Sequence, residues 1–280
     1  MSSTIKVKID KLTPTGLFSE EDFLAIEEPL EIRLNHFENN QRKENNLSIT
    51  MRTPGNDSEL ALGFLFTEGI IDSMDQVLSV NSFSENIITI AFKENVIFNI
   101  KKLEKHFYTS SSCGICGKTS IEAIRTIKNS TAKNESPIIN SSVIHNLPSA
   151  LRKKQNIFEQ TGGLHASAIF NSEGELILLC EDVGRHNALD KLIGSALKNN
   201  ILPLEKYILL LSGRASFELI QKATMAGITI VASIGAPSSL AVELANERKM
   251  TLIGFMRNEH FNIYCGKERI ELTKSNLKFA

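Results

Sequence analysis

The second half of the chain alternates short apolar runs with segments whose apolar residues recur at helical spacing. The runs predict strands at 164–170, 175–179, 207–211, 228–232 and 251–255. The helical spacing predicts helices at 187–197, 215–226 and 238–248. This alternation is typical of an α/β layer with a largely parallel sheet, in which the polar loops after the strands form the usual ligand site.

The first half has a different pattern. After a short strand-like start, a helix is predicted from Asp57 to Glu68, with Asn56 and Glu59 at capping-box spacing. The β-rich runs 87–92 and 96–100 are separated by three residues, which predicts a hairpin. We therefore expect a small α+β unit here.

The middle of the chain joins these two patterns. A Ser- and Gly-rich loop precedes a predicted helix at 119–128, and the polar run 129–137 is expected on the surface. A further helix is predicted at 148–160, stopped by Gly162 and Gly163. These features predict two domains, a small N-terminal α+β domain at 1–108 and an α/β domain at 109–280 whose start carries the loop.

Composition and charge exclude several classes of protein. With 280 residues, 42% hydrophobic and 22% charged, the chain has the composition of a folded globular protein. Lys and Arg total 31 against 32 acidic residues, so no global field favours nucleic acid or an anionic membrane. We find no secretory signal and no run long enough to cross a membrane, and therefore expect a cytoplasmic protein.

Two of the four cysteines, Cys113 and Cys116, form a Cys-x-x-Cys in the Ser- and Gly-rich loop. Such a pair can bind a metal, form a disulfide, or let one thiol assist chemistry at the other. Zinc needs two further ligands, and the isolated Cys180 and Cys265 provide no second pair. Thioredoxin-like redox chemistry is disfavoured because the pair does not follow a βαβ start, and an exposed loop with incidental cysteines is a further alternative.

A reactive, sulfur-carrying thiolate is the interpretation we favour for this loop. Gly114 and Gly117 permit tight backbone bends, while Lys118 and the N-terminus of the following helix stabilise a thiolate. We expect no stably bound metal.

His165, in the segment Thr161-Gly-Gly-Leu-His-Ala-Ser167, invites comparison with the zinc deaminases. In those enzymes a His-x-Glu supplies a metal ligand and a general acid/base, and a Cys-x-x-Cys follows. Ser167 stands in place of the glutamate and no such pair follows, so deaminase chemistry is disfavoured. A histidine of this kind is more often a structural hydrogen-bonding residue.

Three predicted strand-to-helix loops carry residues suited to anions. Arg185 and His186 precede one helix, Ser212 and Arg214 follow the next strand, and a third loop at 233–239 contains Gly, Ser and Pro. Each loop alone is a weak signal, because capping residues are common there. Three in succession indicate one phosphate-binding pocket.

A fourth segment follows the last predicted core strand. Its residues Arg257, Asn258 and His260 can provide polar recognition, and Phe255 can pack on a base. The alternative is an ordinary surface turn.

Several blocks together resemble the formate dehydrogenase accessory sulfurtransferase family, FdhD, over nearly the whole chain. These blocks are 52–69, Cys113-Gly-Ile-Cys-Gly117, 161–166, 181–191 and Ser212-Gly-Arg214. The resemblance implies a cytidine-deaminase-like three-layer α/β domain with a smaller N-terminal α+β domain. It also implies a homodimer.

The implied function is sulfur transfer. A cysteine desulfurase would donate sulfur, Cys113 would carry it as a persulfide with Cys116 assisting or resolving, and molybdenum bis-molybdopterin guanine dinucleotide would accept it before entering formate dehydrogenase. The family's cofactor-binding stretch corresponds here to Phe255, Met256, Arg257, Asn258, Glu259 and His260. The rival hypothesis is a non-enzymatic chaperone that binds and delivers the cofactor, and a deaminase-like hydrolase is more distant.

Overall fold

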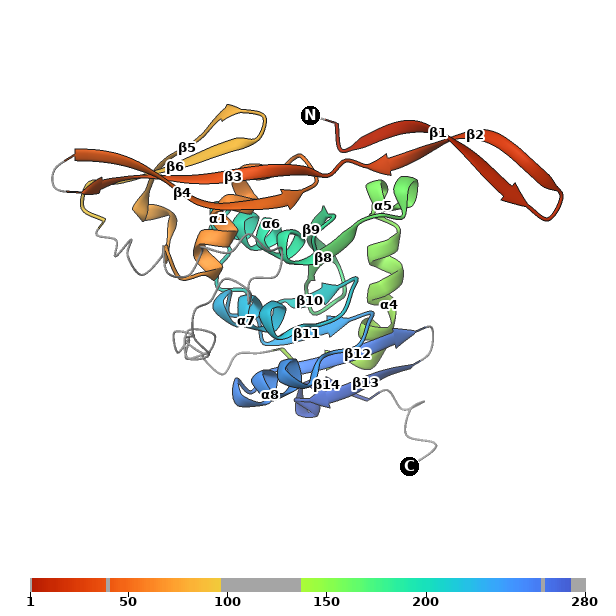
Figure 1. Cartoon of the computed structure of the whole chain (residues 1–280). Coiled ribbons are helices and arrows are strands. Elements are labelled where there is room, and N and C mark those ends of the chain that lie inside the picture. The colour runs from red at the N-terminus through yellow and green to blue at the C-terminus, as the bar shows by residue number, and fades with distance from the viewer. Residues whose placement is uncertain (1, 39–40, 97–136, 258–259, 273–280) are drawn as a thin grey trace.

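The computed structural model describes residues 2–38, 41–96, 137–257 and 260–272. Its first element is a long antiparallel hairpin of β1 (Thr4–Thr13) and β2 (Gly16–Ala25), which extends away from the rest of the molecule (Figure 1). Gly16 has a φ of 145° at the two-residue turn, a conformation that favours glycine. Large apolar side chains on this arm are exposed, including Leu12 at 80% and Leu17 at 66%.

A four-stranded sheet follows, in the order β4-β3-β6-β5. Its strands are β3 (Glu28–Glu38), β4 (Gln41–Arg52), β5 (Val77–Ser84) and β6 (Ile87–Phe92). Leu30, Ile32 and Leu34 alternate with less buried residues along β3, so one face of the sheet is apolar. That face packs on α1 (Asp57–Thr67), which a short 3-10 turn, η1 (Met74–Gln76), separates from β5.

Two expectations for this region are wrong in detail. The helix predicted at Asp57 to Glu68 is confirmed as α1, but Asn56 adopts a left-handed conformation and its side chain makes no capping hydrogen bond. The strand at 87–92 is confirmed as β6, but it pairs with β3 on one edge and β5 on the other. Both edges are therefore occupied, and β6 does not form the predicted hairpin with 96–100, of which 97–100 lie outside the described residues.

The second half of the chain forms a six-stranded sheet in the order β13-β12-β11-β10-β8-β9. Its strands are β8 (His165–Phe170), β9 (Leu176–Asp182), β10 (Ile208–Leu211), β11 (Ile230–Ser233), β12 (Thr251–Arg257) and β13 (His260–Cys265). Strands β9, β10, β11 and β12 run in one direction, while β8 and β13 run antiparallel to their neighbours. Each predicted strand is present, but the sheet is mixed, because β8 and β13 oppose the direction of the other strands.

Helices cover both faces of this sheet and make three layers (Figure 1). One face packs on α6 (Arg185–Lys198), α7 (Phe217–Met225) and α8 (Ser239–Glu247), and the other on α4 (Ser141–Arg152). Leu209 and Leu211 face the first group, and Ile208 and Leu210 face α4, because successive strand side chains alternate. The remaining elements are α5 (Asn156–Thr161), β7 (Ile139–Asn140), η2 (Lys267–Arg269) and β14 (Ile270–Glu271).

The prediction of one continuous helix at 148–160 is wrong. Asn140 caps α4, whose eighth residue is Pro148, and the chain then breaks before α5. Ile144, Leu147 and Leu151 bury one face of α4, and this packing offsets the backbone hydrogen bond that a proline cannot donate. The predicted stop is confirmed, since Gly162 ends α5 at a φ of 64°.

Helices α1 and α6 join the two parts of the molecule by crossing in backbone contact. A Cβ added at Gly63 would lie 1.8 Å from the carbonyl oxygen of Asp190, and one at Gly194 would lie 1.9 Å from that of Glu59. Only glycine fits at either position. The domain boundary predicted between 108 and 109 lies outside the described residues and stays a prediction.

Candidate functional site

The predicted anion-binding loops meet at one edge of the six-stranded sheet. Strands β9, β10, β11 and β12 all end there, and β8 begins there with His165, which lies opposite Asp182 in the register. The loops that follow the strands are 183–184, 212–216 and 234–238. Polar groups at this edge can converge on one ligand.

Two hydrogen bonds of Ser212 hold the loop at 212–216 against β8. The amide of Ser212 donates to the carbonyl of Ala166 at 3.0 Å, and its hydroxyl accepts from the amide of Ala166 at 2.8 Å. A Cβ at Gly213 would lie 3.2 Å from Nδ1 of His165, so the loop passes directly over the imidazole. The hydroxyl of Ser212 therefore has a structural role as well as any role toward a ligand.

The loop at 212–216 contacts the loop at 234–238, which in turn contacts β12. The amide of Gly235 donates to the carbonyl of Gly213 at 3.0 Å, and the amide of Phe255 donates to the carbonyl of Gly235 at 3.1 Å. The Cγ of Arg214 would lie 3.1 Å from a Cβ at Gly235, so the arginine stem crosses that glycine and its head is exposed. A continuous band of loop backbone thus connects His165 to Phe255.

Phe255 has an unusual backbone conformation within β12. Its φ is 51°, in the left-handed region that bulky residues rarely adopt, and the pairing of β12 with β13 shifts register between Gly254 and Arg257. Such outliers persist only where the surrounding structure holds them, and they concentrate at functional sites. The hydrogen bond from its amide to Gly235 places the partly exposed Phe255 next to the loop at 234–238.

The neighbours of Phe255 divide between surface and core. Arg257 and His260 are exposed and face each other across the turn from β12 to β13. Met256 is 4% exposed and belongs to the apolar cluster beneath α4, so its side chain is not available at the surface. Asn258 and Glu259 lie outside the described residues.

Positive charge gathers at the start of α6. Gly184 is the N-cap and no described side chain caps this helix, so its first amides are available to an anion. Burial, followed by the charges of Arg185 and His186, lowers the pKa of His165 below its ordinary value of 6.5, while Asp182 acts in the opposite direction. His165 is therefore a neutral imidazole at pH 7, capable of both donating and accepting a hydrogen bond.

His186 is fixed by an acidic partner that the sequence analysis did not identify. Its Nε2 lies 2.7 Å from Oε2 of Glu218 and 3.4 Å from Oγ of Ser216. Glu218 lies in the first turn of α7, and an acidic residue there is usually explained by the helix dipole, so the sequence carried no distinct signal.

Most of the segment 181–191 forms internal contacts. Lys191 Nζ lies 2.7 Å from Asp182 Oδ2, and both side chains are almost completely buried. Asp182 also accepts hydrogen bonds from the amides of Thr53 and Gly184 and from the side chain of Asn187. This network joins the end of β4 to the start of α6 and so positions Arg185 and His186.

The predicted catalytic residues, Cys113 and Cys116, lie outside the described residues. Of the other cysteines, burial raises the pKa of Cys180 to about 12, and burial also raises the pKa of Cys265. Both thiols are therefore poor nucleophiles. The described part of the chain contains no group of three or more His, Cys, Asp and Glu side chains arranged for a metal, and no described helix is long and apolar enough to span a membrane.

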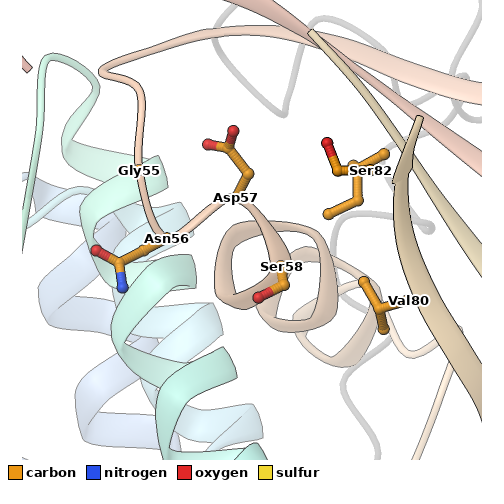
Figure 2. A pocket seen from close by; sticks show the side chains of 7 residues that line it. Gly55, Asn56, Asp57, Ser58, Val80 and Ser82 are labelled. Carbon is orange, nitrogen blue, oxygen red and sulfur yellow. The ribbon is translucent and has the colours of Figure 1, made fainter. Parts of the chain in front are cut away.

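A cavity of about 310 Å³ lies away from this edge, between the start of α1 and the four-stranded sheet. Figure 2 shows Asp57 and Ser58 from α1 and Val80 and Ser82 from β5 around it. Asp57 is held by the buried Arg52 through two hydrogen bonds of 2.9 and 3.0 Å. None of the predicted site residues lines this cavity.

Comparison with known proteins gives a consistent result over the whole chain. Residues 25–271 match the model of the FdhD/NarQ family. The chain is 44% identical to the sulfur carrier protein FdhD of Streptomyces avermitilis, with 96% of each chain covered. It is 46% identical to the sulfur carrier protein FdhD of Sulfolobus acidocaldarius, covering 95% of this chain and 98% of the relative.

The fold also matches a solved structure. A crystal structure of a proposed formate dehydrogenase accessory protein from Desulfotalea psychrophila superposes with a TM-score of 0.74 at 24% identity, covering 96% of this chain and all of the other. At that identity the match supports the mixed α/β fold alone. The family match and the two full-length relatives carry the assignment, and the chain belongs to the FdhD/NarQ family.

Proposed function

We propose that the protein is a sulfur carrier that passes sulfur from a cysteine desulfurase to molybdenum bis-molybdopterin guanine dinucleotide, so that formate dehydrogenase becomes active. The observation that carries the proposal is the full-length similarity to sulfur carrier proteins FdhD, in a chain that has the pair Cys113-Gly-Ile-Cys116. The desulfurase and formate dehydrogenase are the protein partners in this proposal.

The proposed loading step begins at Cys113. Its thiolate attacks the outer sulfur of a persulfide on the desulfurase, a new S–S bond forms at Cys113, and the desulfurase cysteine leaves as a thiolate. This exchange needs no outside oxidant or reductant. Attack by Cys116 on the inner sulfur would then release the outer sulfur as hydrosulfide for the acceptor and leave a Cys113–Cys116 disulfide, which an external thiol must reduce.

The edge of the six-stranded sheet is the proposed site for the sulfur acceptor. Arg185, Arg214 and the open amides at the start of α6 suit phosphate groups, and the ring of Phe255 suits a flat base. His186, Ser212, Arg257 and His260 provide further polar groups at the same edge. The roles of Met256, Asn258 and Glu259 stay predictions.

Three associated features also stay proposals. Persulfide chemistry requires reduced thiols, which favours the cytoplasm. The family resemblance favours a homodimer. The six-stranded sheet, with β8 antiparallel between β9 and β10, supports the proposal of a cytidine-deaminase-like domain.

Persulfide labelling and intact mass measurement after incubation with a cysteine desulfurase and cysteine test the central step. We expect a sulfur adduct on Cys113 that is absent from Cys113→Ala and retained in Cys265→Ala. No adduct on either cysteine of the pair, with the desulfurase shown to be active, would contradict sulfur transfer and support a chaperone that only binds the cofactor.

Titration with GDP tests the acceptor site separately. We expect Arg257→Ala to weaken GDP binding by about tenfold, since an arginine–phosphate or arginine–base contact contributes on the order of 1–3 kcal/mol. Lys206→Ala, an exposed substitution away from the edge, should leave the affinity unchanged. Equal GDP affinities for the wild type and Arg257→Ala would show that Arg257 does not contribute to the site.

A further inference from the structure

A histidine, a serine and a glutamate from two neighbouring helices meet beside the proposed acceptor site. His186 is the second residue of α6, Ser216 is the N-cap residue of α7, and Glu218 lies in the first turn of α7. Oε2 of Glu218 lies 2.7 Å from Nε2 of His186. The two side chains are only 11% and 12% exposed, so salt and water screen this contact poorly.

The contact with Glu218 determines which ring nitrogen of His186 carries a hydrogen. An ionised carboxylate only accepts hydrogen bonds, so Nε2 donates to it and is protonated. The hydroxyl of Ser216 does not cap its own helix and lies 3.4 Å from the same nitrogen. The described residues provide no hydrogen-bond partner for Nδ1, which is therefore the ring nitrogen left for a ligand.

The groups around this ring favour an anionic ligand. Burial, and then the charges of Arg185 and His186, lower the pKa of His165 on β8, which shows that the three side chains are close neighbours. Asp182, at the end of β9, acts on His165 in the opposite direction, but its carboxylate is paired with a buried lysine. The first amides of α6 add positive partial charge at the same place.

We propose that Glu218 is a positioning residue that lets His186 bind an anion together with a proton. The inference rests on the proposed acceptor site and concerns the phosphate groups of its ligand. Since Nε2 already donates to Glu218, Nδ1 donates to a phosphate oxygen only when the ring takes up a second proton from solvent. That proton adds a positive charge beside the anion, and the carboxylate of Glu218 balances the charge from the other side of the ring.

Calorimetric titration of the full-length protein with GDP, repeated at pH 8 in buffers of different ionisation enthalpy, measures the protons taken up on binding. An ordinary imidazole is mostly neutral at this pH, so uptake by the ring is detectable. We expect the wild type to take up a substantial fraction of a proton per GDP and His186→Gln to lose that fraction. Glu243→Gln, an exposed change on α8, should behave as the wild type does.

The variant Glu218→Gln separates the proposed role from a purely structural one. It keeps an oxygen that can accept from Nε2 and removes the charge that balances the second proton. We expect it to bind GDP about fivefold more weakly than the wild type at pH 8 and about equally at pH 6, where solvent supplies the proton more readily. The double variant with His186→Gln should bind no more weakly than His186→Gln alone.

The outcomes distinguish this inference from the acceptor site on which it rests. Equal proton uptake by the wild type and His186→Gln would overturn the inference while leaving the acceptor site in place. A loss of affinity in Glu218→Gln that is as large at pH 6 as at pH 8 would do the same. A wild type that does not bind GDP would overturn the acceptor site itself, and this inference with it.

Discussion

At the residue scale, a buried ion pair beside the start of α6 positions the predicted site residues Arg185 and His186. Asp182 and Lys191 neutralise each other inside the protein and also bond to Thr53, which belongs to the N-terminal part of the chain. The sequence predicted Arg185 and His186 at a helix start, and this placement is confirmed. The Asp182–Lys191 pair was not predicted, because polar residues after a strand carry no sign of what they will contact.

Removing one member of the Asp182–Lys191 ion pair should strongly destabilise the protein. We expect Asp182→Ala to lower the free energy of unfolding by about 3–5 kcal/mol, because Lys191 would be left buried without a counter-charge. Denaturant unfolding followed by circular dichroism measures the change. Asp22→Ala on the exposed hairpin is the matched control and should have no measurable effect.

The buried imidazole of His165 should make stability depend on pH. Its folded pKa lies below 6.5, so as the pH falls through that value the unfolded chain takes up a proton before the folded chain does, and stability decreases. We expect His165→Gln to lose less stability than the wild type between pH 7.5 and 5.5. Burial also lowers the pKa of His36, so the stability of the variant still depends on pH to some extent. The control His260→Gln, a change at an exposed residue, should behave as the wild type does.

At the scale of elements, the strands and helices after residue 164 were predictable because their apolar patterns reflect burial on both faces of the sheet. The hairpin β1–β2 was not recognised beyond a strand-like start, since its exposed residues follow no burial pattern. The sheet's strand directions were also not predictable, because periodicity carries no information on pairing. In the sequence, only Gly63 and Gly194 indicate the crossing of α1 with α6. A single glycine in a helix does not show which other helix packs against it.

This crossing predicts a large effect from a small change. Gly63→Ala should separate α1 from α6 and lower the melting temperature by several degrees or prevent folding, because the added methyl group would overlap the Asp190 carbonyl. Gly163→Ala is the matched control, since its added carbon would meet its nearest neighbour at 3.6 Å. Equal melting temperatures for the two variants, measured by circular dichroism, would contradict this packing.

At the scale of the whole molecule, helices α1 and α6 join the two sheets. The backbone contact of α1 with α6 is reinforced by Thr67, whose hydroxyl lies 2.8 Å from both Asp190 Oδ1 and Lys222 Nζ. Separating the sheets would expose these charged groups without their partners. The two parts are therefore expected to unfold together.

Calorimetry can check that expectation. We expect one transition in which the calorimetric and van't Hoff enthalpies agree, as for a single cooperative unit. Two resolved transitions would show that the four-stranded sheet is stable independently of the six-stranded sheet.

The hairpin arm also affects how the protein moves through solution. A body with a long projection (Figure 1) has a higher frictional coefficient than a sphere of the same mass, so it diffuses more slowly and elutes earlier from a sizing column. A monomer with this shape would elute at an inflated apparent mass. Light scattering, which measures mass without reference to shape, is therefore the appropriate way to count subunits, and a form lacking residues 2–25 should show a much smaller discrepancy between the two methods.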